Sequence, residues 1–179
     1  AMKFLKHASF YIMKALILAE DGFEDLELFY PYYRLKEEGF DVTIASSKKK
    51  ISGKHGYEIE TNADYDAIDA SRYDCLIIPG GKSPERVRLN ENAIEITKHF
   101  FEKNKPIAVI CHGAQVLISA GVVKNRNMAC WYGIKDDVVA AGGNFVDGVA
   151  VDGNLVSARF PQDLPEWMRE FIKLLRKGK

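Results

Sequence analysis

The sequence predicts an α/β fold in which a mostly parallel sheet is covered by helices on both faces. Short apolar runs typical of buried strands alternate with longer segments whose apolar residues recur every three or four positions. This alternation is typical of a parallel sheet whose strands are joined by helices. The chain has 179 residues, of which 47% are hydrophobic, so a single domain can bury a sizeable core.

Apolar runs in the first two thirds of the chain predict the central strands. They lie at residues 15–19, 42–45, 75–78 and 106–110. A helix is expected over residues 24–38, because apolar residues there are spaced mostly at three or four and Gly39 ends the segment. Residues 51–61 are expected to form a small hairpin, and a helix starting near Pro84 or Asn92 precedes the last of these strands.

The C-terminal third contains shorter elements separated by turn residues. A helix over residues 114–120 follows the strand at 106–110, and a final helix begins at Asp163 or Pro165 and ends near Arg176. The elements expected between them are strands at residues 128–131, 145–146, 149–151 and 155–158 and a helix at 136–141.

Residues 1–12 are expected to be an appendage, and residues 13–179 a single domain. The first segment is mildly basic and apolar, but no small-residue cleavage site follows it. No stretch of the sequence is expected to span a membrane. The 25 basic and 25 acidic residues cancel, which gives no electrostatic reason to expect nucleic acid or a membrane surface as a partner.

The cysteines and histidines do not predict a metal site. Cys75, Cys111 and Cys130 lack any C-x-x-C spacing, so neither a disulfide framework nor a zinc site is expected. The four histidines show no metal-ligand spacing such as H-E-x-x-H. Reduced thiols of this kind fit a cytoplasmic protein best.

The strand at residues 106–110 runs directly into Cys111, His112 and Gly113, and a helix follows at once. A strand, a sharp turn and a helix in this order form a nucleophile elbow, which holds one side chain clear of the sheet edge. A thiol at a helix N-terminus is expected to shift towards the reactive thiolate. His112 can act as its base or its ion-pair partner, and Gly113 allows close approach of substrate or backbone. A lone cysteine would more often be a buried structural residue, but this pattern favours a nucleophile.

Gly80 and Gly81 follow the strand at residues 75–78. In a parallel sheet the functional crevice lies at the carboxyl ends of the strands, so these glycines are expected close to Cys111. Backbone N–H groups of consecutive glycines can stabilise an oxyanion during acyl transfer. By itself, a Gly-Gly pair would indicate no more than a tight turn.

Six short motifs occur in order along the chain. They are EDLE at residues 24–27, GKHGY at 53–57, PGG at 79–81, PERVR at 84–88, ICHG at 110–113 and GIKDD at 133–137. Together they resemble the PfpI intracellular protease family, which belongs to the class I glutamine amidotransferase-like superfamily. The resemblance extends from residue 13 to the C-terminal helix and implies a flavodoxin-like three-layer sandwich with a nucleophile elbow.

The resemblance implies roles for four residues. Cys111 is the nucleophile, His112 is the imidazole beside it, and an acid matching Glu85 comes from a neighbouring subunit to orient His112. An acid matching Glu24 lies beside the nucleophile. Because an ionised carboxylate would raise the pKa of the thiol, we expect Glu24 to be buried, protonated and hydrogen-bonded to the sulfur. On sequence alone, Glu24 also fits an acid at a helix N-terminus, and Glu85 a surface acid near a helix start.

The function implied by the resemblance is that of a cofactor-free, cysteine-dependent hydrolase that cleaves small peptides. A second enzymatic interpretation is a glyoxalase or deglycase that acts on methylglyoxal, glyoxal or their adducts. A third, non-enzymatic one is a redox sensor or chaperone in which Cys111 is oxidised. The chain departs from the family pattern around Trp131 and Tyr132, which we expect to line the pocket, so substrate preference stays open.

The resemblance also implies a homo-oligomer, a dimer or a hexamer, with each site completed by a neighbouring subunit. Tyr30, Tyr32 and Tyr33 crowd one stretch of the first helix. Core packing accounts for part of this aromatic cluster, and a subunit interface would account for the rest.

Overall fold

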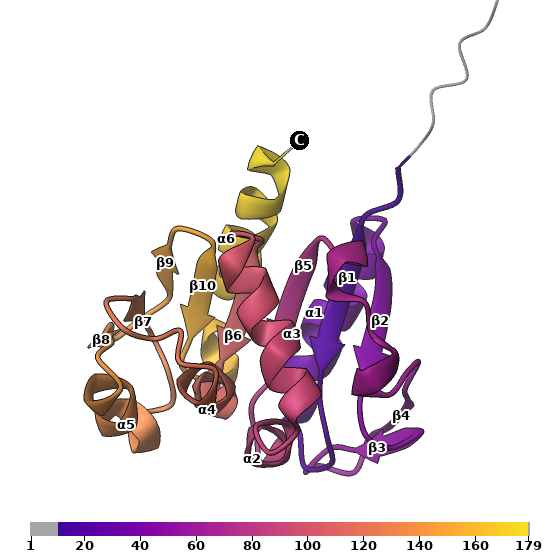
Figure 1. The fold of residues 1–179 in the computed structure, drawn as a ribbon, viewed down its shortest axis with the longest axis horizontal. Helices are drawn as coiled ribbons and strands as arrows, with labels where there is room; N and C mark the ends of the chain where they lie inside the picture. Colours follow the sequence, from indigo (N-terminus) through magenta and orange to yellow (C-terminus); the bar gives the residue numbers. More distant parts are fainter. Residues whose placement is uncertain (1–10, 179) are drawn as a thin grey trace, which may run out of the picture.

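The computed structural model contains a central six-stranded sheet with the strand order β2-β1-β5-β6-β10-β9 (Figure 1). The strands are β1 (Lys14–Leu18), β2 (Asp41–Ala45), β5 (Cys75–Ile78), β6 (Ile107–Ile110), β9 (Ala150–Asp152) and β10 (Leu155–Ala158). Neighbouring strands are parallel except for β9, which pairs antiparallel with β10 at the sheet edge. The structure describes residues 11–178, so residues 1–10 of the expected appendage lie outside it.

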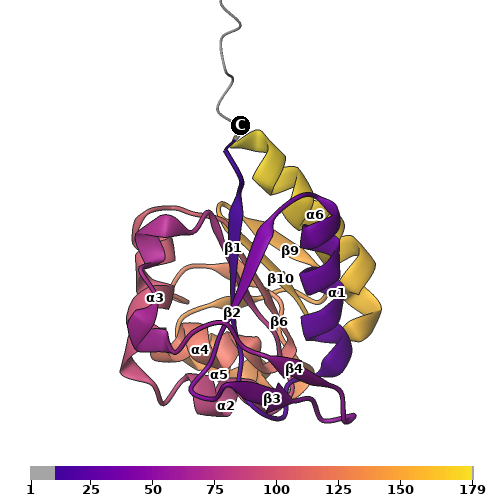
Figure 2. The same cartoon turned by 90° about the vertical axis from the view of Figure 1, so that its right-hand side faces the viewer.

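The helices lie on both faces of this sheet (Figure 2). Helices α1 (Asp25–Glu37) and α6 (Leu164–Lys177) cover one face, where Leu28, Trp167 and Phe171 pack against the strands. The opposite face carries α2 (Ser83–Val87), α3 (Glu91–Glu102), α4 (Ala114–Ser119) and α5 (Lys135–Ala140). The predicted three-layer sandwich is therefore confirmed. Covering on both faces explains why every residue of β5 and β6 is buried and apolar.

Two small sheets lie outside the central one. The expected hairpin consists of β3 (Lys50–Ser52) and β4 (Glu58–Glu60), which pair antiparallel. Strands β7 (Asn127–Met128) and β8 (Asn144–Phe145) form a short parallel pair. The strand predicted at residues 128–131 thus ends early, because the chain turns at Trp131, whose N–H donates to Cys111 O over 3.2 Å.

The helix expected before β6 is two helices, α2 and α3. Asn90 separates them and caps the second, since its side chain accepts a hydrogen bond from Ala93 N at 3.1 Å. None of the helices between residues 11 and 178 is long and apolar enough to cross a membrane.

Replacement of Trp167 by alanine should destabilise the fold strongly. Trp167 is fully buried between α6 and the sheet, and its Nε1–H donates to Val156 O over 3.2 Å. Loss of so large a side chain from a packed core costs about 3–5 kcal/mol. Urea unfolding should show this loss, whereas Leu89→Ala, at a side chain 81% exposed, should change stability by less than about 0.5 kcal/mol. Equal effects of the two substitutions on stability would contradict the burial of Trp167 in the core.

Candidate active site

Cys111 occupies the elbow between β6 and α4 in a strained backbone conformation. Its φ is 60°, in the left-handed region that residues with a side chain seldom adopt. Gly113 makes this turn possible, because a Cβ at that position would lie 2.7 Å from Ile78 O on the neighbouring strand. The predicted nucleophile elbow is present, and Gly113 packs beneath it against β5.

The sulfur of Cys111 is surrounded by polar groups although the residue is only 8% exposed. Cys111 Sγ lies 3.4 Å from His112 Nδ1. The backbone N–H groups of Gly81 and His112 interact with the sulfur and favour its ionised form. These are the donors available to a charge that develops at the sulfur or on an atom bonded to it.

The acid that lies against the sulfur is Glu27. Its side chain is fully buried, Oε1 accepts a hydrogen bond from Gly80 N at 3.0 Å, and Oε2 has no hydrogen-bond partner in the described part of the chain. Burial, and next the charge of Glu24, raise the pKa of Glu27 to about 8. The carboxyl is therefore largely protonated at neutral pH, and its unpartnered oxygen can carry the proton towards Cys111.

The prediction that Glu24 contacts the sulfur is wrong, although Glu24 is buried as expected. Glu24 is the N-cap of α1, and its Oε2 accepts a hydrogen bond from Glu27 N at 3.0 Å. Its Oε1 lies 3.4 Å from Nε2 of His55. Residues three apart share one side of a helix, so the acid one turn further along the EDLE motif reaches the sulfur instead.

Burial raises the pKa of the Cys111 thiol to about 12, and the charge of Glu27 adds to this effect. The sequence had suggested the opposite shift, from the positive end of a helix. Desolvation wins because the sulfur lies beneath the surface, next to an acid, at the start of a short helix. Protonation of Glu27 removes the opposing charge, so the states of these two groups are linked.

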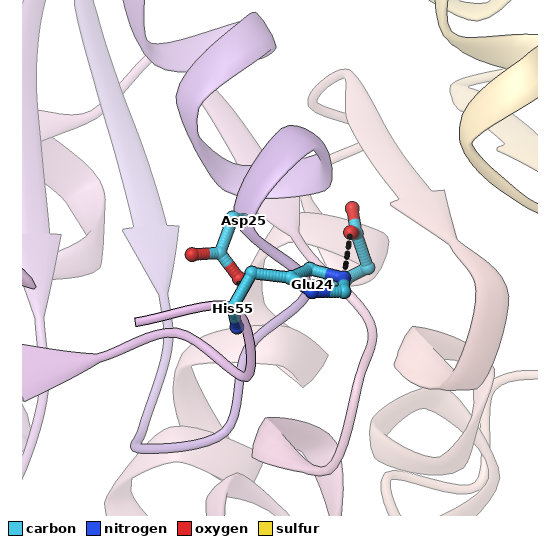
Figure 3. A group of neighbouring side chains, drawn as sticks. All are labelled: Glu24, Asp25 and His55. Atoms are coloured by element: carbon cyan, nitrogen blue, oxygen red, sulfur yellow. Dashed lines mark hydrogen bonds and ion pairs between the residues drawn. The ribbon is translucent and has the colours of Figure 1, made fainter. Parts of the chain in front are cut away.

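Glu24, Asp25 and His55 lie together at the start of α1 (Figure 3). Their ligand atoms fall within 4.8 Å of one another, which is close enough to surround an ion. Both oxygens of Asp25, however, accept backbone N–H bonds, from His55 at 2.9 Å and Tyr57 at 3.1 Å. One oxygen of Glu24 is also used, so the cluster serves to fasten the loop between β3 and β4.

Gly80 and Gly81 have different roles in the site. Gly80 N–H donates to Glu27 and Gly80 O accepts from Glu24 N at 3.1 Å, so this peptide is not free to hold an oxyanion. A Cβ on Gly80 would lie 2.6 Å from the Cβ of Cys111. Gly80 thus permits the close approach of Glu27 and Cys111, and Gly81 supplies the donor. The expectation that the Gly80 N–H group stabilises an oxyanion is therefore corrected.

A pocket of about 410 Å³ opens above the sulfur. Its lining comprises Glu24, Glu27, Lys54, Gly81, Lys82, Glu85, Cys111, His112, Trp131, Phe160 and Pro161. Trp131 forms one wall, with its ring centroid 6.4 Å from that of His112. Tyr132 was expected in the lining too, but its hydroxyl donates to Asp147 Oδ1 at 2.7 Å and it stands outside the pocket.

His112 and Glu85 line the same pocket of one chain. Burial lowers the pKa of His112, and the Glu85 carboxylate opposes this effect. No ion pair within 4.0 Å joins these two side chains in the described chain, so Glu85 lies near the imidazole without orienting it. Sequence reasoning missed Glu27 and Lys54. Both lie inside the EDLE and GKHGY motifs, which were the signals that could have indicated them.

The sequence pattern of the DJ-1/PfpI family matches residues 13–174. The chain belongs to the DJ-1/PfpI family. Within it, the chain is 54% identical over 166 residues to the protein named Deglycase PfpI from Pyrococcus furiosus, covering 92% of this chain and 100% of that one. It is 37% identical over 166 residues to the Bacillus subtilis protein named "Putative cysteine protease YraA", and the match covers 91% of this chain and 98% of that one.

A solved structure shares the family fold. It is a two-domain protein from Anabaena variabilis that contains DJ-1/ThiJ/PfpI-like and ferritin-like domains. The TM-score is 0.89 with 32% sequence identity, and the match covers 93% of this chain and 48% of that chain. The present chain thus spans about half of the two-domain protein. These DJ-1/PfpI likenesses confirm the predicted family, its flavodoxin-like fold and its cysteine-dependent enzymatic character.

Replacement of Glu27 by glutamine should change how stability depends on pH. The folded-state pKa of Glu27 is about 8 against an ordinary value of 4.5, so the folded protein keeps a proton that the unfolded chain releases between these values. The contribution of Glu27 to the free energy of unfolding is therefore greatest below its ordinary pKa of 4.5. It falls as the pH rises towards the folded-state pKa of about 8, by roughly 1.4 kcal/mol per pH unit at most.

Urea unfolding between about pH 5 and pH 9 measures this effect. The stability of Glu27→Gln relative to wild type should rise across the range and level off near the upper end. Glu58→Gln is the control, because Glu58 is an exposed acid whose lowered pKa lies below this range. If the difference between Glu27→Gln and wild type stays constant, Glu27 does not hold a proton in the folded protein.

Proposed function

We propose that this protein is a deglycase that removes methylglyoxal from amines and thiols, with Cys111 as nucleophile. The observation that carries the proposal is the fully buried carboxyl of Glu27 against the sulfur, where burial raises its pKa to about 8 and favours its protonated form. An acid with a pKa near neutrality can both give and accept a proton during one reaction. The names of close relatives, such as Deglycase PfpI, support the same conclusion.

The chemistry needs no external oxidant or reductant. Cys111 sulfur bonds to the former aldehyde carbon of the adduct while the carbon–nitrogen bond breaks and the amine leaves with a proton. The resulting hemithioacetal shifts one proton from this carbon to the neighbouring carbonyl carbon through an enediol. The first carbon is thereby oxidised and the second reduced, which yields a lactoyl thioester. Water then releases lactate and the free thiol.

The residues around the sulfur suit these proton transfers. Cys111 must lose its proton to attack, and His112 Nδ1, 3.4 Å away, can accept it. His112 stays neutral more readily because burial lowers its pKa. Glu27 can donate to the leaving group or to the enediol oxygen, and the N–H groups of Gly81 and His112 stabilise the negative charge.

Peptide hydrolysis is the second candidate, and the position of Glu85 favours it. A cysteine peptidase uses an acid to orient the histidine that serves the thiol. Glu85 lines the pocket beside His112, and its charge opposes the lowering of the His112 pKa by burial; an ion pair with this imidazole would complete such a triad. The deglycase proposal ranks first, because its acid already lies at the sulfur within one chain.

A redox-sensing role is less well supported. Sensor cysteines are exposed and have a low pKa, whereas burial raises the pKa of Cys111 to about 12. The three cysteines are free and buried, which fits a reducing compartment. We therefore place the proposed reaction in the cytoplasm.

The proposal is tested with the methylglyoxal adduct of N-acetyllysine and a panel of fluorogenic peptides. Wild type should release lactate from the adduct, and Cys111→Ser should lower this rate by at least about a thousand-fold. Glu27→Gln should lower it by about a hundred-fold, because glutamine cannot transfer the proton. Cys75→Ala removes a thiol buried in β5, outside the pocket, and should retain the rate. Turnover of peptides without lactate release would favour the peptidase candidate instead.

We further propose that the protein works as a homo-oligomer in which Glu85 of a neighbouring copy completes the site. Glu85 is exposed and unpaired with His112 within its own chain, and Tyr30 and Tyr33 remain 38% and 62% exposed on α1. Exposed aromatic side chains grouped on one helix are typical of subunit interfaces.

Subunit mixing distinguishes the two possible sources of the acid. Cys111→Ser and Glu85→Ala chains should each have low activity, and refolding them together should restore activity. In a symmetric dimer about a quarter of the wild-type value is expected, because half of the dimers are mixed and each contains one intact site. If Glu85 acts within its own chain, the mixture stays as inactive as its components.

A further inference from the structure

The loop between β3 and β4 places a lysine in the active-site pocket. Lys54 lines the pocket together with Cys111, and its positive charge acts on Cys111, Glu27 and His112. The loop is distant from the elbow in sequence, and neither the proposed proton transfers nor the oxyanion donors make use of Lys54. Its presence beside the reacting sulfur therefore needs a separate explanation.

The backbone of this loop is fixed by a buried carboxylate. Asp25 is 4% exposed, and its two oxygens accept hydrogen bonds from His55 N at 2.9 Å and Tyr57 N at 3.1 Å. Lys54 N itself donates to Phe23 O at 2.9 Å. Burying a charged group is costly unless it is hydrogen-bonded, so Asp25 holds the loop firmly against α1. The backbone from which the Lys54 side chain extends is therefore firmly positioned.

The charge of Lys54 is not neutralised within the described chain. Among residues 11–178, no carboxylate lies within 4.0 Å of its Nζ, although many other surface lysines and arginines form such pairs. Of the three acids that line the pocket, Glu24 caps α1 and pairs with His55, Glu27 is bonded to Gly80, and Glu85 forms no ion pair with Lys54. A cation that lines the same pocket as Cys111, with no counter-ion among the described residues, is suited to an anionic ligand.

We infer that Lys54 binds a carboxylate of the substrate, so that the site prefers methylglyoxal adducts of molecules with a free carboxylate, such as amino acids and C-terminal residues. This inference rests on the proposed deglycase function. Lys54 would be a specificity-determining residue, since it contacts the part of the substrate that does not react. Binding of that remote group positions the adduct carbon at Cys111.

Lys82 provides a matched control. It is an exposed lysine that lines the same pocket from the turn after β5, with its backbone N–H donating to Gly22 O at 2.8 Å. Unlike Lys54, it is not among the charges that shift the pKa of Cys111. The two lysines thus share charge, exposure and the pocket, and differ in the element that carries them and in their effect on Cys111.

Alkylation of Cys111 tests the inference without any catalytic turnover. Iodoacetate and iodoacetamide react alike: a sulfur–carbon bond forms, the carbon–iodine bond breaks, iodide leaves and the thiol proton passes to solvent. They differ in that iodoacetate carries a carboxylate and iodoacetamide a neutral amide. The ratio of their rate constants at one pH cancels any effect of a substitution on the pKa of Cys111. Cys75 and Cys130 are fully buried and should not interfere.

The iodoacetate-to-iodoacetamide ratio, followed by mass spectrometry, should fall about tenfold in Lys54→Gln. Lys54→Arg should keep most of the preference, and Lys82→Gln should change the ratio by less than about twofold. An unchanged ratio in Lys54→Gln, or an equal fall in Lys82→Gln, would overturn the inference.

A second measurement uses the proposed reaction itself. Methylglyoxal forms hemithioacetals with N-acetylcysteine, which has a carboxylate, and with N-acetylcysteine amide, which has none. Lys54→Gln should lower kcat/KM about tenfold for the first, mainly through KM, and leave the second nearly unchanged. If wild type turns over neither compound, the proposed function fails. If wild type turns over both and Lys54→Gln affects them equally, the inference about Lys54 alone fails.

Discussion

The left-handed backbone at Cys111 is the constraint on which the rest of the site depends. A residue with a side chain in this region costs on the order of 1–3 kcal/mol and persists only where the surrounding structure enforces it. Here the buried strand β6 fixes one side of the turn, the contact of Gly113 with β5 fixes the other, and Trp131 N–H holds the carbonyl of Cys111. The strain keeps the sulfur beside Gly80 and Glu27 and at the floor of the pocket.

Three acidic residues at the start of α1 each have a different structural role. Glu24 caps the helix, Asp25 fastens the loop that carries Lys54, and Glu27 lies against the sulfur. All three are buried, which is unusual for acidic residues and costly unless each has a partner or a proton. Asp25 has backbone donors for both oxygens, whereas one oxygen of Glu27 has no hydrogen-bond partner among residues 11–178. The acid with the unsatisfied oxygen is the one that lies beside Cys111.

The electrostatics of the sulfur depend on burial more than on the helix that follows it. A short helix start and two backbone N–H groups favour the thiolate, but desolvation and the nearby acid oppose them and raise the pKa of Cys111. The thiol and Glu27 together can be regarded as one proton-carrying unit. The charge of Glu27 opposes ionisation of the Cys111 thiol, and the cation of Lys54 favours negative charge on both groups.

The sequence by itself determined the sandwich, the elbow and the place of Cys111 at its turn, because these depend on local patterns. Apolar runs bounded by glycine and proline specify buried strands, and a strand followed by Cys-His-Gly and a helix can turn in few ways. Only the tertiary structure decided which acid of the EDLE motif meets the sulfur, that Tyr132 stands outside the pocket, and that Lys54 enters it. The reason is physical: side-chain direction at a helix start, the folding back of a distant hairpin and the desolvation of a buried thiol all depend on packing between segments remote in sequence.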